Sequence, residues 1–192
     1  MGKILRVIAG KYRSRPLRSL PGMDLRPTAD RLRETLFGIL TAGNPEALEG
    51  TVWIDFFAGT GAVGIEALSR GAGMVYFVEK SAKAAELIRQ NLHSLGVEEG
   101  FRIMKQDVKK AFSGLAEQGA TADFIFLDPP YRMEEVYGQT LESLGKSQLP
   151  KPGSLVMAEH QKKFDPRETF PLMRRCRKLE QGDAALSFYR RI

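Results

Sequence analysis

From residue 51 onward, short apolar runs alternate with segments whose apolar positions recur at helical spacing. The apolar runs, which predict strands, are residues 52–57, 74–79, 101–105, 123–128 and 154–159. The amphipathic segments, which predict helices, are residues 62–70, 82–95, 108–118 and 134–144. Strands that are almost wholly apolar and separated by helices form a parallel sheet covered on both faces. The pattern therefore predicts an open α/β fold with right-handed crossovers.

The last two predicted strands are not separated by a helix. Residues 174–180 and 185–190 predict two strands joined by a turn at Gly182, and the segment between them is too short for a helix. A terminal antiparallel hairpin on a parallel sheet is therefore expected.

The first 45 residues also depart from the alternation. Their beginning mixes short apolar and basic pieces around Gly10 and predicts a small β-hairpin. Thr28 is then a candidate N-cap for a helix. The apolar positions of that helix recur at helical spacing and are Leu32, Leu36, Ile39 and Leu40. We therefore divide the chain into an N-terminal extension, residues 1–45, and an α/β domain, residues 46–192.

Basic residues are concentrated in that extension. The chain of 192 residues has 29 Lys and Arg against 23 Asp and Glu, a net charge of +6. Residues 1–33 hold nine of the basic residues against Asp24 and Asp30, a balance of +7, so the rest of the chain holds 20 against 21. A local basic excess favours an anionic partner. The candidate nucleic-acid-binding residues are Arg6, Lys11, Arg13, Arg15, Arg26 and Arg33.

Cysteine usage and hydropathy restrict the class of protein. Cys176 is the single cysteine, so an intramolecular disulfide is excluded, and the thiols are too few for a structural zinc site. The start of the chain lacks the apolar run of about 7 to 15 residues that signal peptides have. No segment approaches the roughly 18 uninterrupted apolar residues of a membrane span. We expect a cytoplasmic monomer with no metal and no membrane partner.

A glycine-rich turn follows the first predicted strand. Asp55 ends the strand, and Phe57, Gly59, Gly61 and Gly64 follow at the edge where open α/β sheets bind ligands. The spacing of the glycines also fits a dinucleotide fingerprint. However, a carboxylate at Asp55 would repel a pyrophosphate and suits a ligand with an ammonium and a sulfonium. The turn therefore favours S-adenosylmethionine over NAD.

Two further acids follow later strands. Glu79 ends the second predicted strand, where a carboxylate can accept hydrogen bonds from both ribose hydroxyls of an adenosine. Asp107 follows the third strand and can meet the adenine amino group, although such a residue is as often a helix cap or a solvated loop residue. Because the carboxyl ends of parallel strands share one edge, Asp55, Glu79 and Asp107 together predict a cofactor site.

The most specific motif is Asp128-Pro129-Pro130-Tyr131, directly after the fourth predicted strand. Two prolines fix two φ angles and remove two amide donors, so the loop presents a carboxylate and carbonyl oxygens. The exocyclic amino group of a base is a poor nucleophile because its lone pair is delocalised into the ring. Hydrogen bonds from its protons to Asp128 and the Pro129 carbonyl would direct that lone pair and stabilise the developing positive charge. Tyr131 would stack on a base taken out of its helix or loop.

These motifs resemble those of a known family. Residues 55–61 are similar to motif I of class I methyltransferases, and residues 128–131 to the Asp-Pro-Pro-Tyr motif of amino-group methyltransferases. Six further stretches resemble the RsmD family of ribosomal RNA guanine methyltransferases, nearly end to end: residues 6–10, 26–37, 66–72, 77–80, 159–160 and 182–187.

The resemblance implies a class I methyltransferase (Rossmann-like) fold, with a seven-stranded, mostly parallel sheet and an antiparallel last strand. Residues 46–192 would then be the catalytic domain. It also implies S-adenosylmethionine as the cofactor and methylation of a guanine amino group in small-subunit (16S) ribosomal RNA. The partner would be that RNA, within the small subunit or an assembly intermediate.

Other interpretations stay open. The Asp-Pro-Pro-Tyr motif does not identify the base, so a DNA adenine or cytosine amino-methyltransferase is the main alternative, although residues 132–153 leave little room for a recognition domain. An NAD-dependent oxidoreductase and a catalytically silent RNA-binding module are the others. His160 could hold the target base or be structural. Cys176 has no base partner nearby in the sequence, which disfavours a cysteine nucleophile.

The basic cluster Arg174, Arg175, Arg177 and Lys178 is a further candidate phosphate contact. Basic side chains are also common on solvated edge strands. We interpret this cluster as a solvated edge strand.

Overall fold

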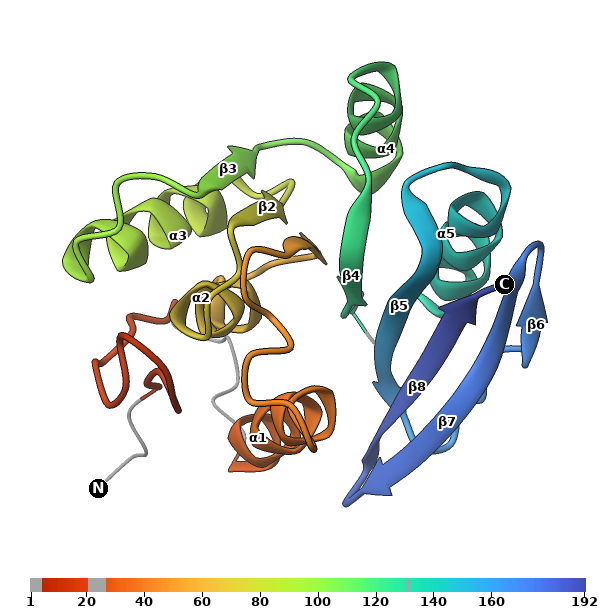
Figure 1. The fold of residues 1–192 in the computed structure, drawn as a ribbon, viewed down its shortest axis with the longest axis horizontal. Coiled ribbons are helices and arrows are strands. Elements are labelled where there is room, and N and C mark those ends of the chain that lie inside the picture. Colours follow the sequence, from red (N-terminus) through yellow and green to blue (C-terminus); the bar gives the residue numbers. More distant parts are fainter. Residues whose placement is uncertain (1–4, 21–26, 131) are drawn as a thin grey trace.

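A mixed sheet runs through the molecule, with helices on both of its faces (Figure 1). The computed structural model describes residues 5–20, 27–130 and 132–192, apart from the side chains of residues 27–29. The strands are β1 (Val52–Phe56), β2 (Met74–Val78), β3 (Phe101–Met104), β4 (Ala122–Leu127), β5 (Pro150–Gln161), β6 (Thr169–Phe170), β7 (Met173–Gln181) and β8 (Ala184–Arg191). Their order is β3-β2-β1-β4-β5-β8-β7-β6. Strands β1 to β5 are parallel, and β8 is antiparallel to both β5 and β7.

This sheet confirms the mostly parallel α/β fold with an antiparallel last strand, but it has eight strands and not seven. The additional strand, β6, consists of Thr169 and Phe170, which pair with the start of β7. Two residues carry no periodicity, so the sequence pattern could not reveal this strand. Strand β5 also begins at Pro150 and not at residue 154. Proline and Gly153 disfavour a strand interior, and a register shift against β4 accompanies them.

The helices form two layers. Helices α1 (Pro27–Leu40), α2 (Ala62–Ser69) and α3 (Ala82–Ser94) cover one face, and α4 (Val108–Glu117) and α5 (Glu134–Lys146) cover the other. Because side chains alternate along a strand, Trp53 packs in the core beneath α1 and α2, while Ile54 packs beneath α4 and α5. Asp55 consequently faces the α2 side. Among the described residues, no helix has the length and apolarity that crossing a membrane requires.

The N-terminal extension differs from the prediction in two details. Helix α1 begins at Pro27, so Thr28 lies inside the helix and is not its N-cap. Proline suits the first helical position, where an amide donor has no intrahelical partner. Within residues 5–20, which the structure describes, the predicted β-hairpin provides one isolated antiparallel bridge, between Arg6 and Pro16, and no longer strand. Ser14 has a left-handed φ of 66°, which takes the returning chain out of extended geometry next to that bridge.

The extension is firmly docked on α2. The fully buried carboxylate of Glu66 accepts hydrogen bonds from the backbone N–H groups of Ile8 (2.7 Å) and Ala9 (3.0 Å), and from Nε of Arg70 (2.8 Å). A Cβ atom on Gly10 would lie 1.8 Å from a backbone carbonyl oxygen of α2, so only glycine fits there. Apolar side chains of the extension also join the core that contains Trp53. The extension and the α/β domain therefore form one packed unit.

Candidate active site

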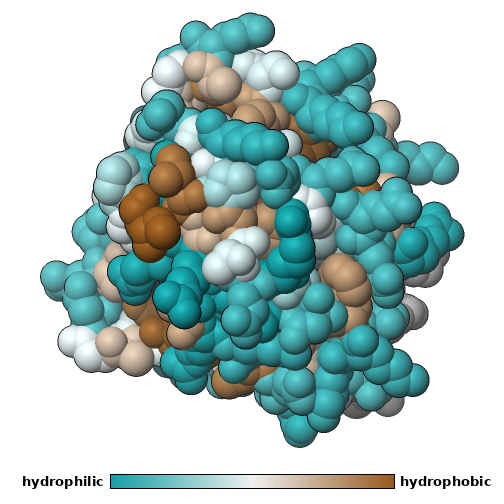
Figure 2. Space-filling model, turned by 90° about the vertical axis from the view of Figure 1, so that its right-hand side faces the viewer, coloured by the Kyte–Doolittle hydropathy of each residue, from teal (hydrophilic) through white to brown (hydrophobic). Residues whose placement is uncertain are grey.

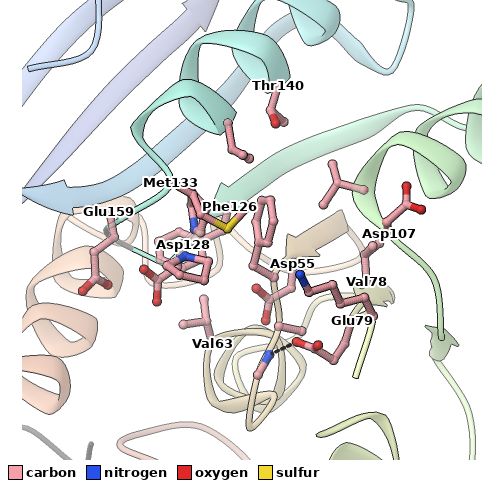
Figure 3. A pocket seen from close by; sticks show the side chains of 18 of the residues that line it. Asp55, Val63, Val78, Glu79, Asp107, Phe126, Asp128, Met133, Thr140 and Glu159 are labelled. Carbon is pink, nitrogen blue, oxygen red and sulfur yellow. Dashed lines mark hydrogen bonds between the residues drawn. The ribbon is translucent and has the colours of Figure 1, made fainter. Parts of the chain in front are cut away.

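A cavity of about 770 Å³ lies over the carboxyl ends of the parallel strands. Eight of the predicted catalytic and cofactor-binding residues line it: Asp55, Phe57, Gly59, Glu79, Asp107, Asp128, Pro129 and Pro130. In Figure 3, Glu79 and Asp107 lie at one end of this cavity, Asp55 lies in the middle, and Asp128 and Glu159 lie at the other end. The structure thus brings the two predicted sets of site residues into one space.

Asp55 is buried at the base of the cavity. Its side chain is 2% exposed, and its Oδ2 accepts a hydrogen bond from the backbone N–H of Gly64 in the first turn of α2 (2.9 Å). Burial raises the pKa of Asp55 to about 7, and the negative charge of Glu79 adds to the rise, while the bond from Gly64 opposes it. A Cβ atom on Gly64 would lie 2.3 Å from the ring of Phe77, so this glycine lets α2 pack closely on the sheet.

The turn between β1 and α2 has an unusual backbone. Phe57, which is not glycine, has a φ of 64°, and Gly59 and Gly61 have φ values of 54° and 78°. Backbone conformations of this kind are rare for residues with a Cβ atom and cluster at ligand sites. Gly61 is the residue before α2 and is not part of the cavity lining. Its predicted part in cofactor binding would therefore act through the shape of the turn.

Glu79 and Asp107 both combine a position at the cavity with a structural contact. The carboxylate of Glu79 accepts hydrogen bonds from the backbone N–H groups of Gly59 (3.0 Å) and Ser81 (2.7 Å). Asp107 is the N-cap of α4, where its side chain accepts a hydrogen bond from the backbone N–H of Lys110 (2.9 Å). Each carboxylate oxygen has two lone pairs, so both acids can accept further hydrogen bonds from a ligand.

The opposite end of the cavity is formed by the loop after β4. Asp128 and Pro129 line the cavity there, and the backbone N–H of Met133 donates to the carbonyl of Pro130 (2.8 Å) where the chain turns into α5. Tyr131, the predicted stacking residue, lies outside the described residues. The structure therefore places Asp128 and Pro129 at the cavity, and the hydrogen bonds expected of their oxygens stay a prediction.

Glu159 also lines this end of the cavity, and Tyr137 packs behind it; the pattern of the sequence did not single out either residue. The buried hydroxyl of Tyr137 lies 3.2 Å from the carbonyl oxygen of Pro129 and 2.8 Å from that of Glu159. In the sequence Tyr137 is one apolar position of a helix. Glu159 was part of a stretch that resembles a family, without a role of its own. Neither position carries a local signal of its function.

The basic residues of the extension fall into two groups. Arg6, Lys11, Arg13 and Arg15 are exposed, whereas Arg26 lies outside the described residues. Arg33 is different, because it is 6% exposed and lines the cavity. Its guanidinium donates to the carbonyl of Arg6 (2.7 Å) and to the carboxylate of Asp30 (3.2 Å). Burial lowers the pKa of Arg33, and the charge of Asp30 opposes this effect.

His160 has a structural environment. It is fully buried, its Nε2 lies 2.9 Å from the hydroxyl of Ser187, and its Nδ1 lies 2.8 Å from the carbonyl of Gln161. Burial lowers the pKa of His160, which disfavours the charged form. His160 is not among the cavity-lining residues, so the structural interpretation applies and not that of a base-holding residue.

Two of the four basic residues in the cluster on β7 form ion pairs with nearby acids. Arg175 forms ion pairs with Asp165 and Glu168, and Lys178 forms ion pairs with Asp165 and Glu180. Figure 2 looks onto the side of the molecule where β6 and β7 lie, and this surface is mostly hydrophilic. The interpretation as a solvated edge fits these contacts. Within the described parts of the chain, no group of three or more His, Cys, Asp or Glu side chains could hold a metal ion.

Comparison with known proteins identifies the family. Residues 5–190 match the family model described as Conserved hypothetical protein 95. The chain is 30% identical to YlbH of Bacillus subtilis (strain 168) over 187 residues, which cover 97% of this chain and 99% of that protein. It is 33% identical to Ribosomal RNA small subunit methyltransferase D of Haemophilus influenzae over 158 residues, 82% of this chain and 79% of the relative. The chain belongs to the RsmD family.

A solved structure of a similar chain agrees with this assignment. The hypothetical protein TTHA0928 of Thermus thermophilus superposes with a TM-score of 0.81 at 28% sequence identity. The superposition covers 96% of this chain and 98% of that one, so it includes the N-terminal extension as well as the α/β domain. Putative methyltransferase yhhF of Escherichia coli superposes with the same TM-score, 0.81, at 27% identity over 98% of each chain. The resemblance to the RsmD family and the class I methyltransferase fold are confirmed.

Proposed function

We propose that this chain transfers a methyl group from S-adenosylmethionine to the exocyclic amino group of a guanine in small-subunit (16S) ribosomal RNA. One observation carries the proposal: a single continuous cavity has acids suited to the cofactor at one end and the acceptors of the Asp128-Pro129 loop at the other. Membership of the RsmD family supports ribosomal RNA as the substrate.

The cofactor end of the cavity fits S-adenosylmethionine. Glu79 would accept hydrogen bonds from the ribose hydroxyls, and Asp107 would meet the adenine amino group. Val78 and Phe112 also line this part of the cavity and would supply apolar contacts for the adenine ring. The negative charge of Asp55 would stabilise a positively charged ligand and would repel a pyrophosphate. This choice of side chains favours the sulfonium cofactor over NAD.

When bound, the cofactor supplies a methyl group on a positively charged sulfur, which keeps the electron pair of the S–C bond as the methyl leaves. The carboxylate of Asp128 and the carbonyl of Pro129 would accept the two protons of the target amino group. They would turn its lone pair toward the methyl carbon and stabilise the positive charge that develops on the nitrogen. Asp128 would then accept the proton that the nitrogen loses as the N–C bond forms, and pass it to water.

The exposed basic residues of the extension would bind the RNA backbone. Arg6, Lys11, Arg13 and Arg15 lie on a segment that also reaches the cavity, since Leu5 lines it. Lys and Arg that contact phosphates contribute affinity without sequence preference and fix the orientation of the nucleic acid. The partner would be the ribosomal RNA within the small subunit or an assembly intermediate, and the enzyme would act as a monomer.

Labelled methyl transfer tests the proposed function. The protein is incubated with S-adenosylmethionine labelled in the methyl group and with three acceptors: naked 16S RNA, small ribosomal subunits and duplex DNA. We expect label in an RNA-containing acceptor and none in DNA. Label in DNA would support a DNA amino-methyltransferase instead. Titration with NADH in parallel should give no binding, whereas tight NADH binding without methyl transfer would contradict the proposal.

A further inference from the structure

Glu159 lies next to Asp128 at the cavity edge of the sheet. The parallel strands β4 and β5 pair up to Leu127 and Ala158, and Asp128 and Glu159 are the next residues on the two strands. Both acids line the cavity, and Figure 3 shows their side chains pointing to the same part of it. The acceptor surface formed by Asp128 and the Pro129 carbonyl is therefore extended by a second carboxylate.

A buried hydroxyl bridges the backbone of the loop after β4 and the backbone of β5 at Glu159. Tyr137, on α5, lies within hydrogen-bond distance of the carbonyls of both Pro129 and Glu159, at 3.2 Å and 2.8 Å. The Tyr137 ring is 1% exposed and packs against Phe164, with ring centroids 5.2 Å apart. A bridging hydroxyl in a packed environment fixes the distance between the groups that it contacts. The backbone of Glu159 is thus held at a fixed position relative to the Asp128-Pro129 loop.

The bases differ in the hydrogen-bonding character of the ring nitrogen next to the exocyclic amino group. In guanine the amino group stands between N1–H and N3, and on its N1 side the base presents two neighbouring donors, the amino group and N1–H. In adenine and cytosine the amino group neighbours a ring nitrogen with a lone pair, which is an acceptor. An ionised carboxylate is itself an acceptor only, so it can bind N1–H and is repelled by the lone pair. A carboxylate beside the amino-binding loop therefore selects guanine and rejects the other two bases.

We infer that Glu159 is the specificity-determining residue of this site and accepts a hydrogen bond from N1–H of the target guanine. Asp128 and the Pro129 carbonyl hold the adjacent amino group at the same time. This inference rests on the proposed function, because it requires that a base amino group enters the cavity. It adds to that function a physical reason for the choice of guanine over adenine and cytosine.

The test replaces the target guanine in the RNA by 2,6-diaminopurine, which keeps the 2-amino group but has a lone pair at N1. For the unmodified protein we expect kcat/KM to be at least about 10-fold lower with diaminopurine than with guanine, because the Glu159 carboxylate would then face the lone pair of N1. For Glu159→Gln we expect the ratio to fall toward one or to reverse, because an amide can donate to the N1 lone pair. The ratio of two substrates in one preparation does not depend on the fraction of folded protein.

Glu98→Gln is the matched control. Glu98 is exposed in the loop before β3, at the opposite end of the parallel strands from the cavity, so its loss should leave the ratio unchanged. Equal methylation of guanine and diaminopurine by the unmodified protein, or an unchanged ratio in Glu159→Gln, would overturn the inference alone. Absence of methyl transfer to any guanine amino group would overturn the proposed function and this inference with it.

Discussion

The two ends of the cavity are built in different ways. At the cofactor end, the acids are also structural, because Asp55 binds the first turn of α2, Glu79 binds Gly59 and Asp107 caps α4. At the acceptor end, the loop after β4 is positioned by a separate side chain, Tyr137. Substitutions at the cofactor end should therefore change ligand affinity and local structure together, whereas those at the acceptor end should change catalysis with less effect on cofactor binding.

Removal of the Asp128 charge should give the largest effect. For Asp128→Asn we expect turnover to fall about 100-fold or more, because the lost interaction stabilises charge that develops only in the transition state. The dissociation constant of S-adenosylmethionine, measured by calorimetry, should change little. Near-normal turnover would show that the Pro129 carbonyl and the neighbouring backbone are sufficient, and the difference between the two ends would lose its main support.

Glu79→Ala should weaken cofactor binding, which Asp128→Asn should leave almost unchanged. Hydrogen bonds to a charged acceptor are worth about 1.5 to 3 kcal/mol, which corresponds to a weakening of cofactor binding by about 10- to 150-fold. RNA affinity should remain almost unchanged. The Gly59 N–H also loses its partner in this variant, so a lower melting temperature is expected as well. Glu98→Ala serves as a control, and equal cofactor dissociation constants in the two variants would remove Glu79 from the site.

The ionisation of Asp55 should make cofactor binding depend on pH. Burial raises its pKa to about 7, so below that pH the carboxyl is mostly protonated in the unliganded protein. A positively charged ligand favours the ionised form and must displace this proton at low pH, so affinity rises with pH. We expect binding of S-adenosylmethionine to tighten by up to about 10-fold between pH 6 and pH 8. A pH-independent dissociation constant in this range would contradict the assignment, and Asp55→Asn should remove the dependence.

Substitution in the basic extension should change RNA binding alone. Arg13 and Arg15 are exposed, and each phosphate contact contributes roughly 0.7 to 0.9 to the slope of log affinity against log salt. Their joint replacement by Ala should lower RNA affinity and reduce this slope by about one to two units. The double replacement of Arg174 and Arg177, exposed on β7, removes the same charge from another surface. If both double variants show the same loss of RNA affinity and of salt slope, the extension binds RNA no more than β7 does.

The smallest effect is expected for Tyr137→Phe, which removes one hydroxyl and keeps the ring. The carbonyls of Pro129 and Glu159 would lose a donor, at a cost of about 1 kcal/mol in stability. We expect a drop of a few fold in turnover with an unchanged KM for S-adenosylmethionine. A drop in cofactor affinity of the same size would show that Tyr137 supports the fold in general and does not position the acceptor loop.

The two ends of the cavity also differ in how far their residues could be predicted from the sequence. Asp55 lies near the end of β1, and Glu79 and Asp128 directly follow β2 and β4. The topology of a parallel sheet brings such strand ends together. Tyr137 and Glu159 acquire their roles from contacts between α5, β4 and β5, which no local pattern encodes.

In the fold, too, elements with a local sequence pattern could be predicted and elements without one could not. The alternation of apolar runs and amphipathic segments was sufficient to predict the central strands and the helices. Strand β6 has two residues, which is too short for a sequence pattern. Pro150 and Gly153 are unusual in strands, so the sequence did not predict the start of β5. Arg33 has the same charge as its exposed neighbours in the sequence. Only the packing of α1 against the extension turns its guanidinium toward the carbonyl of Arg6.

The proposed reaction places a methyl group on the amino group of a guanine in ribosomal RNA. Digestion of the labelled RNA to nucleosides, followed by mass spectrometry, tests it most directly. We expect the label in N2-methylguanosine and expect Asp128→Asn to remove it. Label in N6-methyladenosine, in N4-methylcytidine or in a ring-carbon methyl product would show that the proposed reaction is wrong.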